Sequence, residues 1–158
     1  MVDRIRRICW CHMDAIPHIL YIDDDEHDRF LFSRSFFISG IHGALHCLSS
    51  ASNGLLYLQQ KGPFASSPRP RLIIVDLQLP RSDGQQFHEI LQTDPRWSDI
   101  ALIVLAGTQT NADIDSCYPL AVNMVRPKPQ SDIETIELLR SLSREYLVAQ
   151  PSSLQNSP

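Results

Sequence analysis

The sequence lacks the features of several large protein classes. No apolar run approaches the ~18 residues of a membrane-spanning helix, and the arginines near the start are not followed by the apolar core of a secretory signal. The fourteen Lys and Arg residues are scattered, which, with a net charge of -4, argues against nucleic acid as a direct partner. We therefore expect a cytoplasmic protein that binds neither a membrane nor nucleic acid.

Cysteine and lysine are both scarce. The four cysteines are Cys9, Cys11, Cys47 and Cys117. They form no disulfide framework, and the close pair Cys9 and Cys11 lacks the second pair of ligands that a zinc site needs, so we interpret the pair as incidental. Lysine occurs only at Lys61 and Lys128. Nearly all other cationic residues of the chain are arginines. A lysine at a binding site would therefore fit a need for a compact point charge.

Short apolar runs alternate with helical patterns along the chain, whose 158 residues suffice for one domain. The runs predict strands at about 18–23, 44–48, 72–76, 100–105 and 122–126. Helices are expected at about 27–39, 55–60, 84–93 and 112–118, and after the capping residue Ser131. This alternation predicts an α/β fold with a five-stranded, doubly wound parallel sheet.

The two ends of the chain differ from this middle part. Residues 1–17 fit no regular element, so we expect a flexible N-terminal extension, with a natural start of translation at Met13 as the other explanation. Residues 18–148 form the domain. Residues 149–158 are rich in Ser, Gln, Asn and Pro and predict a disordered tail.

Two helices carry apolar residues that predict how they pack. In the first helix these are Phe30, Leu31, Phe36, Phe37 and Ile38. We interpret this cluster as core packing rather than as a cofactor site. A stripe along the last helix consists of Ile133, Ile136, Leu139, Leu142 and Tyr146. Ser52, Asn53 and Gly54 are expected to form the turn that opens the second helix.

Carboxylates and a lysine follow the apolar runs. Asp23 and Asp24 follow the first strand, Asp76 ends the third, and Lys128 follows the fifth. Because ligands of such sheets bind at the carboxyl ends of the strands, we expect these side chains to gather. Asp23, Asp24 and Asp76 can then hold Mg²⁺, together with the backbone carbonyl of Gln78. On this hypothesis Asp76 takes up a phosphoryl group and Lys128 contacts one of its oxygens.

Each of these residues alone has a more ordinary interpretation. An acidic run such as Asp23–Glu26 is most often the solvated start of a helix, where Asp28 would complement the helix dipole. Asp76 alone, or Asp83 with Gly84, is an ordinary turn former. Their joint position at strand ends, beside a lysine, favours the metal and phosphoryl site. The histidines show no shared spacing and are not expected to be ligands.

Residues 18–148 resemble the receiver domain of bacterial two-component response regulators. The matching motifs are Asp23-Asp24, Asp76 with Leu79-Pro80 and Asp83-Gly84, and Lys128-Pro129. The resemblance implies a flavodoxin-like fold with strand order 2-1-3-4-5. It also implies that Asp76 is the phosphoacceptor, that Lys128 contacts the phosphate, and that a phosphohistidine on a sensor histidine kinase is the donor. Asp23 and Asp24 are then the magnesium ligands.

Three stretches, at residues 58–70, 93–95 and 113–118, are similar to single-domain receivers that serve cyanobacterial and bacterial phytochromes. This similarity implies a phytochrome kinase as the partner and no DNA-binding output domain. It also implies a homodimer that forms through the fourth helix and fifth strand.

Two positions depart from the receiver pattern. Receivers usually carry Ser or Thr at the end of the fourth strand and Tyr or Phe in the fifth, where this chain has Ala106 and Val125. Ala106 has no hydroxyl to bond a phosphoryl oxygen, and Val125 has no ring to swing inward behind it. We therefore expect weakened or atypical switching. Pro127 lacks an amide donor, which predicts that the fifth strand lies at a sheet edge.

The leading hypothesis is a phosphoacceptor in a two-component phosphorelay, which is not an enzyme in the ordinary sense. Ala106 and Val125 favour an alternative, a degenerate receiver that acts as a phosphorylation-independent interaction module. A second alternative is a phosphohydrolase of another α/β class. Gln78 opposes it, because such enzymes usually place a second carboxylate there.

Overall fold

The structure is a computed structural model that describes residues 16–80, 87–91, 93–107 and 124–148. Its sheet consists of β1 (His18–Ile22), β2 (Ala44–Leu48), β3 (Leu72–Asp76), β4 (Ala101–Ala106) and β5 (Met124–Pro127). All neighbouring strands are parallel, in the order β2-β1-β3-β4-β5. The predicted fold class and strand order are therefore confirmed, and β5 lies at an edge, as Pro127 predicted.

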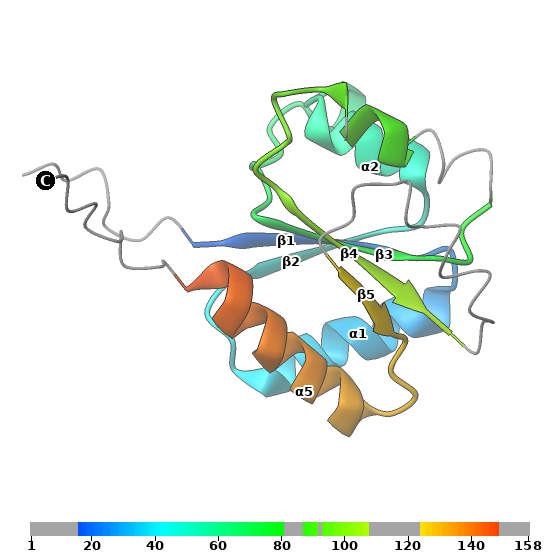
Figure 1. Cartoon of the computed structure of the whole chain (residues 1–158), viewed down its shortest axis with the longest axis vertical. Helices are drawn as coiled ribbons and strands as arrows, with labels where there is room; N and C mark the ends of the chain where they lie inside the picture. The colour runs from blue at the N-terminus through cyan, green and yellow to red at the C-terminus, as the bar shows by residue number, and fades with distance from the viewer. Residues whose placement is uncertain (1–15, 81–86, 92, 108–123, 149–158) are drawn as a thin grey trace, which may run out of the picture.

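Helices cover both faces of the sheet. The helix α2 (Ala51–Leu58) lies on one face, and α1 (Glu26–Ser39) and α5 (Asp132–Leu142) lie side by side on the other (Figure 1). A 3₁₀ turn (η2, Gly62–Phe64) follows α2, and one turn of π-helix (η3, Ser143–Leu147) continues α5. Residues 87–91 are also helical. No helix in the described ranges is long and apolar enough to cross a membrane.

Polar side chains fix where the helices begin. The carboxylate of Asp25 accepts hydrogen bonds from the amides of His27 and Asp28 and starts α1. Ser131 caps α5 by accepting from the amide of Glu134, as predicted. At its other end, α1 stops at Gly40 in the left-handed conformation, with φ of 66°.

The second helix begins earlier than expected. Ser50 is its cap, so α2 starts at Ala51, and the predicted turn at Ser52–Gly54 is wrong. Gly54 lies inside the helix for a packing reason, because a Cβ atom there would lie 2.5 Å from Cδ1 of Ile22. The glycine thus allows α2 to approach β1 closely.

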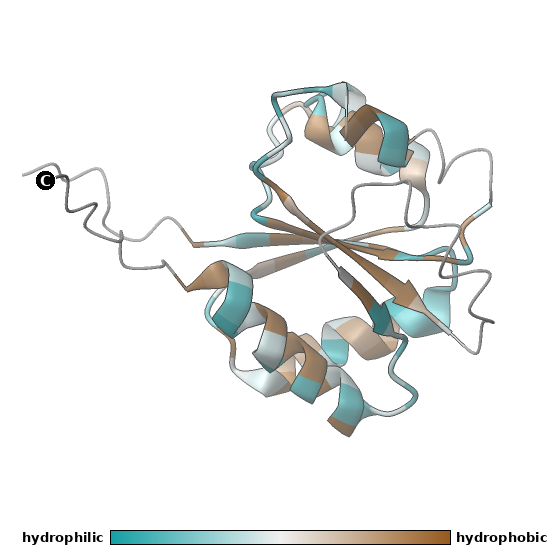
Figure 2. Cartoon of the chain, in the orientation of Figure 1, coloured by the Kyte–Doolittle hydropathy of each residue, from teal (hydrophilic) through white to brown (hydrophobic). Residues whose placement is uncertain are grey.

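The sheet separates two apolar clusters by the alternation of its strands. One cluster contains Leu20, Ile73, Val75, Leu102 and Phe87 with α2, and the other contains Ile19, Leu72, Ile74, Ile103 and Leu105 with α1 and α5. Every residue of β3 and β4 is buried. Figure 2 shows β4 as apolar along most of its length. Central strands buried on both faces explain why the sequence shows them as continuous apolar runs.

The prediction that the apolar cluster of α1 is core packing is wrong for much of the cluster. Phe30, Phe37 and Ile38 are 61%, 86% and 55% exposed, whereas Phe32 is 3% exposed. Three consecutive apolar residues at 36–38 spread over more than one face of a helix, and the sheet covers only one. On α5, Ile133 is 71% exposed, so the predicted stripe is wrong at that position.

Several predictions fall wholly or partly outside the described residues. The helix expected at 112–118 and the tail expected at 149–158 lie outside them. Of the expected extension, only Ile16 and Pro17 are described, and the carbonyl of Pro17 accepts a hydrogen bond of 2.9 Å from Ala44 at the start of β2.

Candidate functional site

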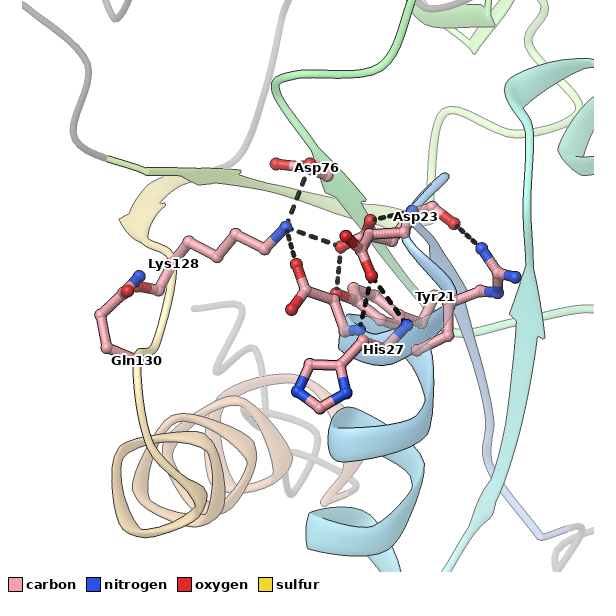
Figure 3. A network of polar contacts seen from close by, with 9 residues as sticks. Tyr21, Asp23, His27, Asp76, Lys128 and Gln130 are labelled. Atoms are coloured by element: carbon pink, nitrogen blue, oxygen red, sulfur yellow. Dashed lines mark hydrogen bonds and ion pairs between the residues drawn. The ribbon is translucent and has the colours of Figure 1, made fainter.

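The carboxyl ends of three strands bring the predicted side chains together. Asp23 follows β1, Asp76 ends β3, and these strands are neighbours in the sheet. Ligand oxygens of Asp23, Asp24 and Asp76 all lie within 4.8 Å of one another. Lys128, directly after β5, reaches toward Asp23 and Asp76 (Figure 3). Four residues from three distant places in the sequence thus share one edge of the sheet.

The ammonium of Lys128 contacts three carboxylates. Its Nζ lies 2.8 Å from Asp23, 3.1 Å from Asp76 and 2.7 Å from Asp28. Burial opposes the positive charge, but hydrogen bonds to Asp23 and Asp28 outweigh it, so the pKa of Lys128 is raised. The lysine therefore stays charged and offsets part of the negative charge of the site.

The contact with Asp28 was not predicted from the sequence. Asp28 was interpreted only as a charge that complements the helix dipole. Its place in the first turn of α1, a helix that starts beside the acidic cluster, is the signal that could have revealed it.

Asp23 is fully buried and held by several donors. The hydroxyl of Tyr21 donates to its Oδ2 at 2.6 Å, and the amide of Asp25 donates to its Oδ1 at 2.9 Å. The guanidinium of Arg29 donates to its backbone carbonyl at 2.7 Å. Sequence reasoning treated Tyr21 only as part of an apolar strand. Its spacing of two residues from Asp23, on one face of β1, is the signal that it missed.

Asp76 is 3% exposed, and its two oxygens differ in their surroundings. Oδ2 accepts from Lys128, whereas Oδ1 is buried without a hydrogen-bond partner of ordinary geometry among the described residues. Burial raises the pKa of Asp76, with Lys128 acting against this rise and Asp23 adding to it. A buried carboxylate oxygen without a partner is costly, and a cation would satisfy it. The three carboxylates therefore fit a hard divalent cation.

The two atypical positions lie on β4 and β5. Ala106 ends β4, is buried, and accepts a hydrogen bond of 2.6 Å from the amide of Lys128 through its backbone carbonyl. Val125 is partly buried in β5, opposite Val104 of β4. Neither residue offers a polar side-chain atom to the site.

A hollow of about 400 Å³ adjoins the cluster. Tyr21 and Asp28 line it from the side of β1 and α1, and Gln78, Lys128 and Gln130 line it from the other side. The hollow leaves room beside the ammonium for a group larger than a single ion.

Known proteins are similar to this chain in sequence and in fold, although no family model matches the chain. The response regulator Rcp1 of Synechocystis sp. is 28% identical over 129 residues, which are 82% of this chain and 88% of Rcp1. The probable methanogenesis regulatory protein FilR2 of Methanothrix harundinacea is 28% identical over 113 residues, 72% of each chain.

Solved structures agree with these likenesses. The phosphorylated cyanobacterial phytochrome response regulator RcpA superposes with a TM-score of 0.75 and 25% identity, over 87% of this chain and 98% of RcpA. The Mn²⁺-bound form of Rcp1 superposes with a TM-score of 0.70 and 29% identity, over 86% of this chain and 99% of Rcp1. Because sequence and structure match nearly the full length of these relatives, the chain is similar to the response regulator receiver domains of two-component signalling represented by Rcp1 and RcpA.

Proposed function

We propose that Asp76 accepts a phosphoryl group from a phosphohistidine on a sensor histidine kinase. The observation that carries this proposal is the unpartnered Oδ1 of Asp76, which lies in a cluster with two further carboxylates and a charged lysine. In the transfer, an oxygen of Asp76 forms the new P–O bond while the P–N bond to the imidazole breaks. The imidazole nitrogen leaves with the electron pair of that bond and takes up a proton.

Charge neutralisation is the main task of the site, because an anionic carboxylate attacks an anionic group. Lys128 already lies 3.1 Å from Asp76, and a modest movement of its flexible side chain brings the ammonium to a phosphoryl oxygen. We propose Mg²⁺ as the cation, which Asp23, Asp24, Asp76 and the carbonyl of Gln78 would hold. When bound, it would neutralise further charge on the phosphoryl oxygens. The Mn²⁺-bound form of Rcp1 supports a divalent cation in such a receiver.

The proposed donor is a protein, and the names of the relatives suggest a phytochrome kinase. A kinase domain that brings its histidine to Asp76 must cover the rim of the site, where α1 begins. The second turn of α1 presents Phe30, which is 61% exposed, and Phe37 follows two turns later at 86% exposure. These side chains offer apolar contact area beside the site. We place this exchange in the cytoplasm and keep the predicted homodimer through the fourth helix and β5 as part of the proposal.

Ala106 and Val125 support a second candidate, a receiver that binds its partner without a phosphorylation-dependent change. Intact mass after incubation with acetyl phosphate and Mg²⁺ separates the two functions. The proposed function predicts an added mass of one phosphoryl group in the wild-type chain and none in Asp76→Asn. Asp94→Asn, which changes a partly buried carboxylate outside the cluster, is expected to keep the adduct. A wild-type chain that gains no mass would favour the interaction module.

The phosphohydrolase alternative predicts a different result. It requires turnover of small phosphate esters, for which the chain has no second carboxylate at Gln78. We expect no such turnover in the presence of Mg²⁺.

A further inference from the structure

Tyr21 is placed unusually for a residue in an apolar strand. It is 1% exposed, and its ring stacks on Phe32 of α1 with centroids 3.9 Å apart and an interplanar angle of 16°. Its hydroxyl ends 2.6 Å from Oδ2 of Asp23. The stack fixes the ring, and the fixed ring determines where the hydroxyl can donate.

The hydroxyl is suited to act only as a donor. A carboxylate oxygen that already accepts from Lys128 has no proton to give, so the phenol supplies the proton of this 2.6 Å hydrogen bond. A phenolate here would add a negative charge to three carboxylates, whereas the neutral hydroxyl satisfies one of their oxygens.

The same oxygen of Asp23 also accepts from Lys128, at 2.8 Å. When the ammonium turns to a phosphoryl group, this fully buried oxygen loses one of its two donors. The Tyr21 hydroxyl is the donor that stays. Together with the amide of Asp25 on Oδ1, it fixes both ends of the carboxylate.

We propose that Tyr21 is a positioning residue that orients the carboxylate of Asp23 for a divalent cation. The inference rests on the metal role proposed above for Asp23. Partners of metal ligands that hold the ligand in place commonly change metal affinity by roughly 10–100-fold when they are removed. Tyr21 acts through Asp23 and does not itself contact the cation.

The test is a calorimetric titration of the full chain with Mn²⁺, without any phosphate donor. Tyr21→Phe removes only the hydroxyl and keeps the stacked ring, and we expect its Mn²⁺ dissociation constant to rise by at least roughly ten-fold. Tyr57→Phe is the matched control. Tyr57 is also buried, but its hydroxyl has no hydrogen-bond partner in the described part of the chain. It should bind Mn²⁺ as the wild-type chain does.

A second variant separates the hydrogen bond from the stability of the fold. Phe32→Leu weakens the stack but keeps the hydroxyl, so it should lower the unfolding midpoint more than Tyr21→Phe and reduce Mn²⁺ affinity less. Equal Mn²⁺ affinity in Tyr21→Phe and the wild type would overturn the role of Tyr21 and leave the proposed function intact. A wild-type chain that binds no Mn²⁺ would overturn both.

Nuclear magnetic resonance of the wild-type chain tests the same hydrogen bond without a substitution. The hydroxyl proton of Tyr21 should exchange slowly with water and stay visible when Mg²⁺ is added, because the bond to Asp23 persists. Loss of that signal on addition of Mg²⁺ would contradict the inference, whether or not Tyr21→Phe folds.

Discussion

The two sides of the Lys128 ammonium are built differently. Toward β1 and α1 the lysine meets Asp23 and Asp28, and Asp23 is held in turn by Tyr21. On β4 and β5 the chain has Ala106 and Val125, whose side chains are entirely apolar. The ammonium thus makes its contacts on a polar side with a network of hydrogen bonds, whereas Ala106 and Val125, here called the apolar side, offer it no polar side-chain atom.

This difference distinguishes the groups that would bind a cation and a phosphoryl group from the groups that would transmit phosphorylation to the rest of the fold. The groups proposed to hold a cation and a phosphoryl group lie at the ends of β1 and β3 and after β5. The groups by which receivers usually sense the phosphoryl group would lie on β4 and β5. On the proposed function, the phosphoacceptor chemistry belongs to the first set of groups, and a conformational response would depend more on the α1 side.

The largest effect is expected from Lys128→Met, which removes the charge that both sides share. Asp23 and Asp76 would be left buried beside each other without a cation, and breaking a buried pair in this way costs about 3 kcal/mol of unfolding free energy. Urea unfolding at neutral pH measures the loss. Saturating Mg²⁺ should recover part of it, because a bound cation replaces the missing charge.

Lys61→Met is the matched control, since Lys61 is the other lysine of the chain and is exposed. Its unfolding free energy should stay within about 0.5 kcal/mol of the wild type. Equal stability of the two variants would show that the ammonium of Lys128 does not hold the polar side together.

The next effect concerns the apolar side. Ala106→Ser adds a hydroxyl at the end of β4, beside the backbone of Lys128. With Mg²⁺ and beryllofluoride, a mimic of the phosphoryl group, the variant should be stabilised by about 2 kcal/mol more than the wild type, as expected for one hydrogen bond to a charged group. Thermal unfolding with and without the mimic measures this difference.

Ala101→Ser introduces the same hydroxyl at the opposite end of β4 and serves as its control. The mimic should stabilise it no more than the wild type. If Ala106→Ser also shows no added stabilisation, the apolar side is not where a hydrogen bond to the phosphoryl group is missing.

The sequence was sufficient to predict the parts of the site that depend on where strands end. Apolar runs located the five strands, and Asp23, Asp76 and Lys128 could be placed at one edge because carboxyl ends of parallel strands meet there. The strand order came from the resemblance to receivers. Ala106 and Val125 were visible as departures because they occupy fixed positions in that pattern.

The remainder depends on tertiary geometry that a linear pattern does not contain. The ion pair between Asp28 and Lys128 depends on which way α1 turns Asp28 and on how far the lysine side chain reaches. The hydrogen bond from Tyr21 to Asp23 depends on the stack of Tyr21 on Phe32. The run at 36–38 is apolar in every position, so its periodicity could not show that Phe37 faces outward. Such positions are decided by which elements happen to cover them.

A smaller effect is expected from the charge of Asp76. Burial raises the pKa of Asp76, so the folded chain binds this proton more tightly than the unfolded chain does. The contribution of Asp76 to the free energy of unfolding is present below the ordinary pKa of an aspartate. It is lost as the pH rises through the raised pKa of Asp76. Asp76→Asn should therefore be more stable than the wild type at neutral pH, and the gain should shrink in acid.

Asp94→Asn should show the opposite sign in the same urea series. Hydrogen bonds from Arg96 lower the pKa of Asp94, so this carboxylate stabilises the fold above its ordinary pKa and the contribution is lost as the pH falls. A neutral-pH loss of stability in Asp76→Asn would show that its contact with Lys128 outweighs the cost of burial.

The smallest effect is expected at Asp28, the most exposed of the three carboxylates that contact Lys128. Its side chain is 35% exposed, so its ion pair with Lys128 is partly screened, and Asp28→Asn should lower the unfolding free energy by no more than about 0.5 kcal/mol. The substitution also leaves the lysine with two carboxylates in place of three. An incoming phosphoryl group then competes with fewer partners for the ammonium.

The rate of phosphorylation by acetyl phosphate at saturating Mg²⁺ should therefore rise in Asp28→Asn, by roughly two-fold if about 0.5 kcal/mol is released. Glu26→Gln removes the same charge from the same helical turn, and in the structure only Asp28 of the two forms an ion pair with the lysine. Equal rates in these two variants would mean that net charge alone sets the rate. A faster Asp28→Asn would show that α1 restrains the lysine directly, and that a phosphoryl group on Asp76 has to loosen this contact to be bound.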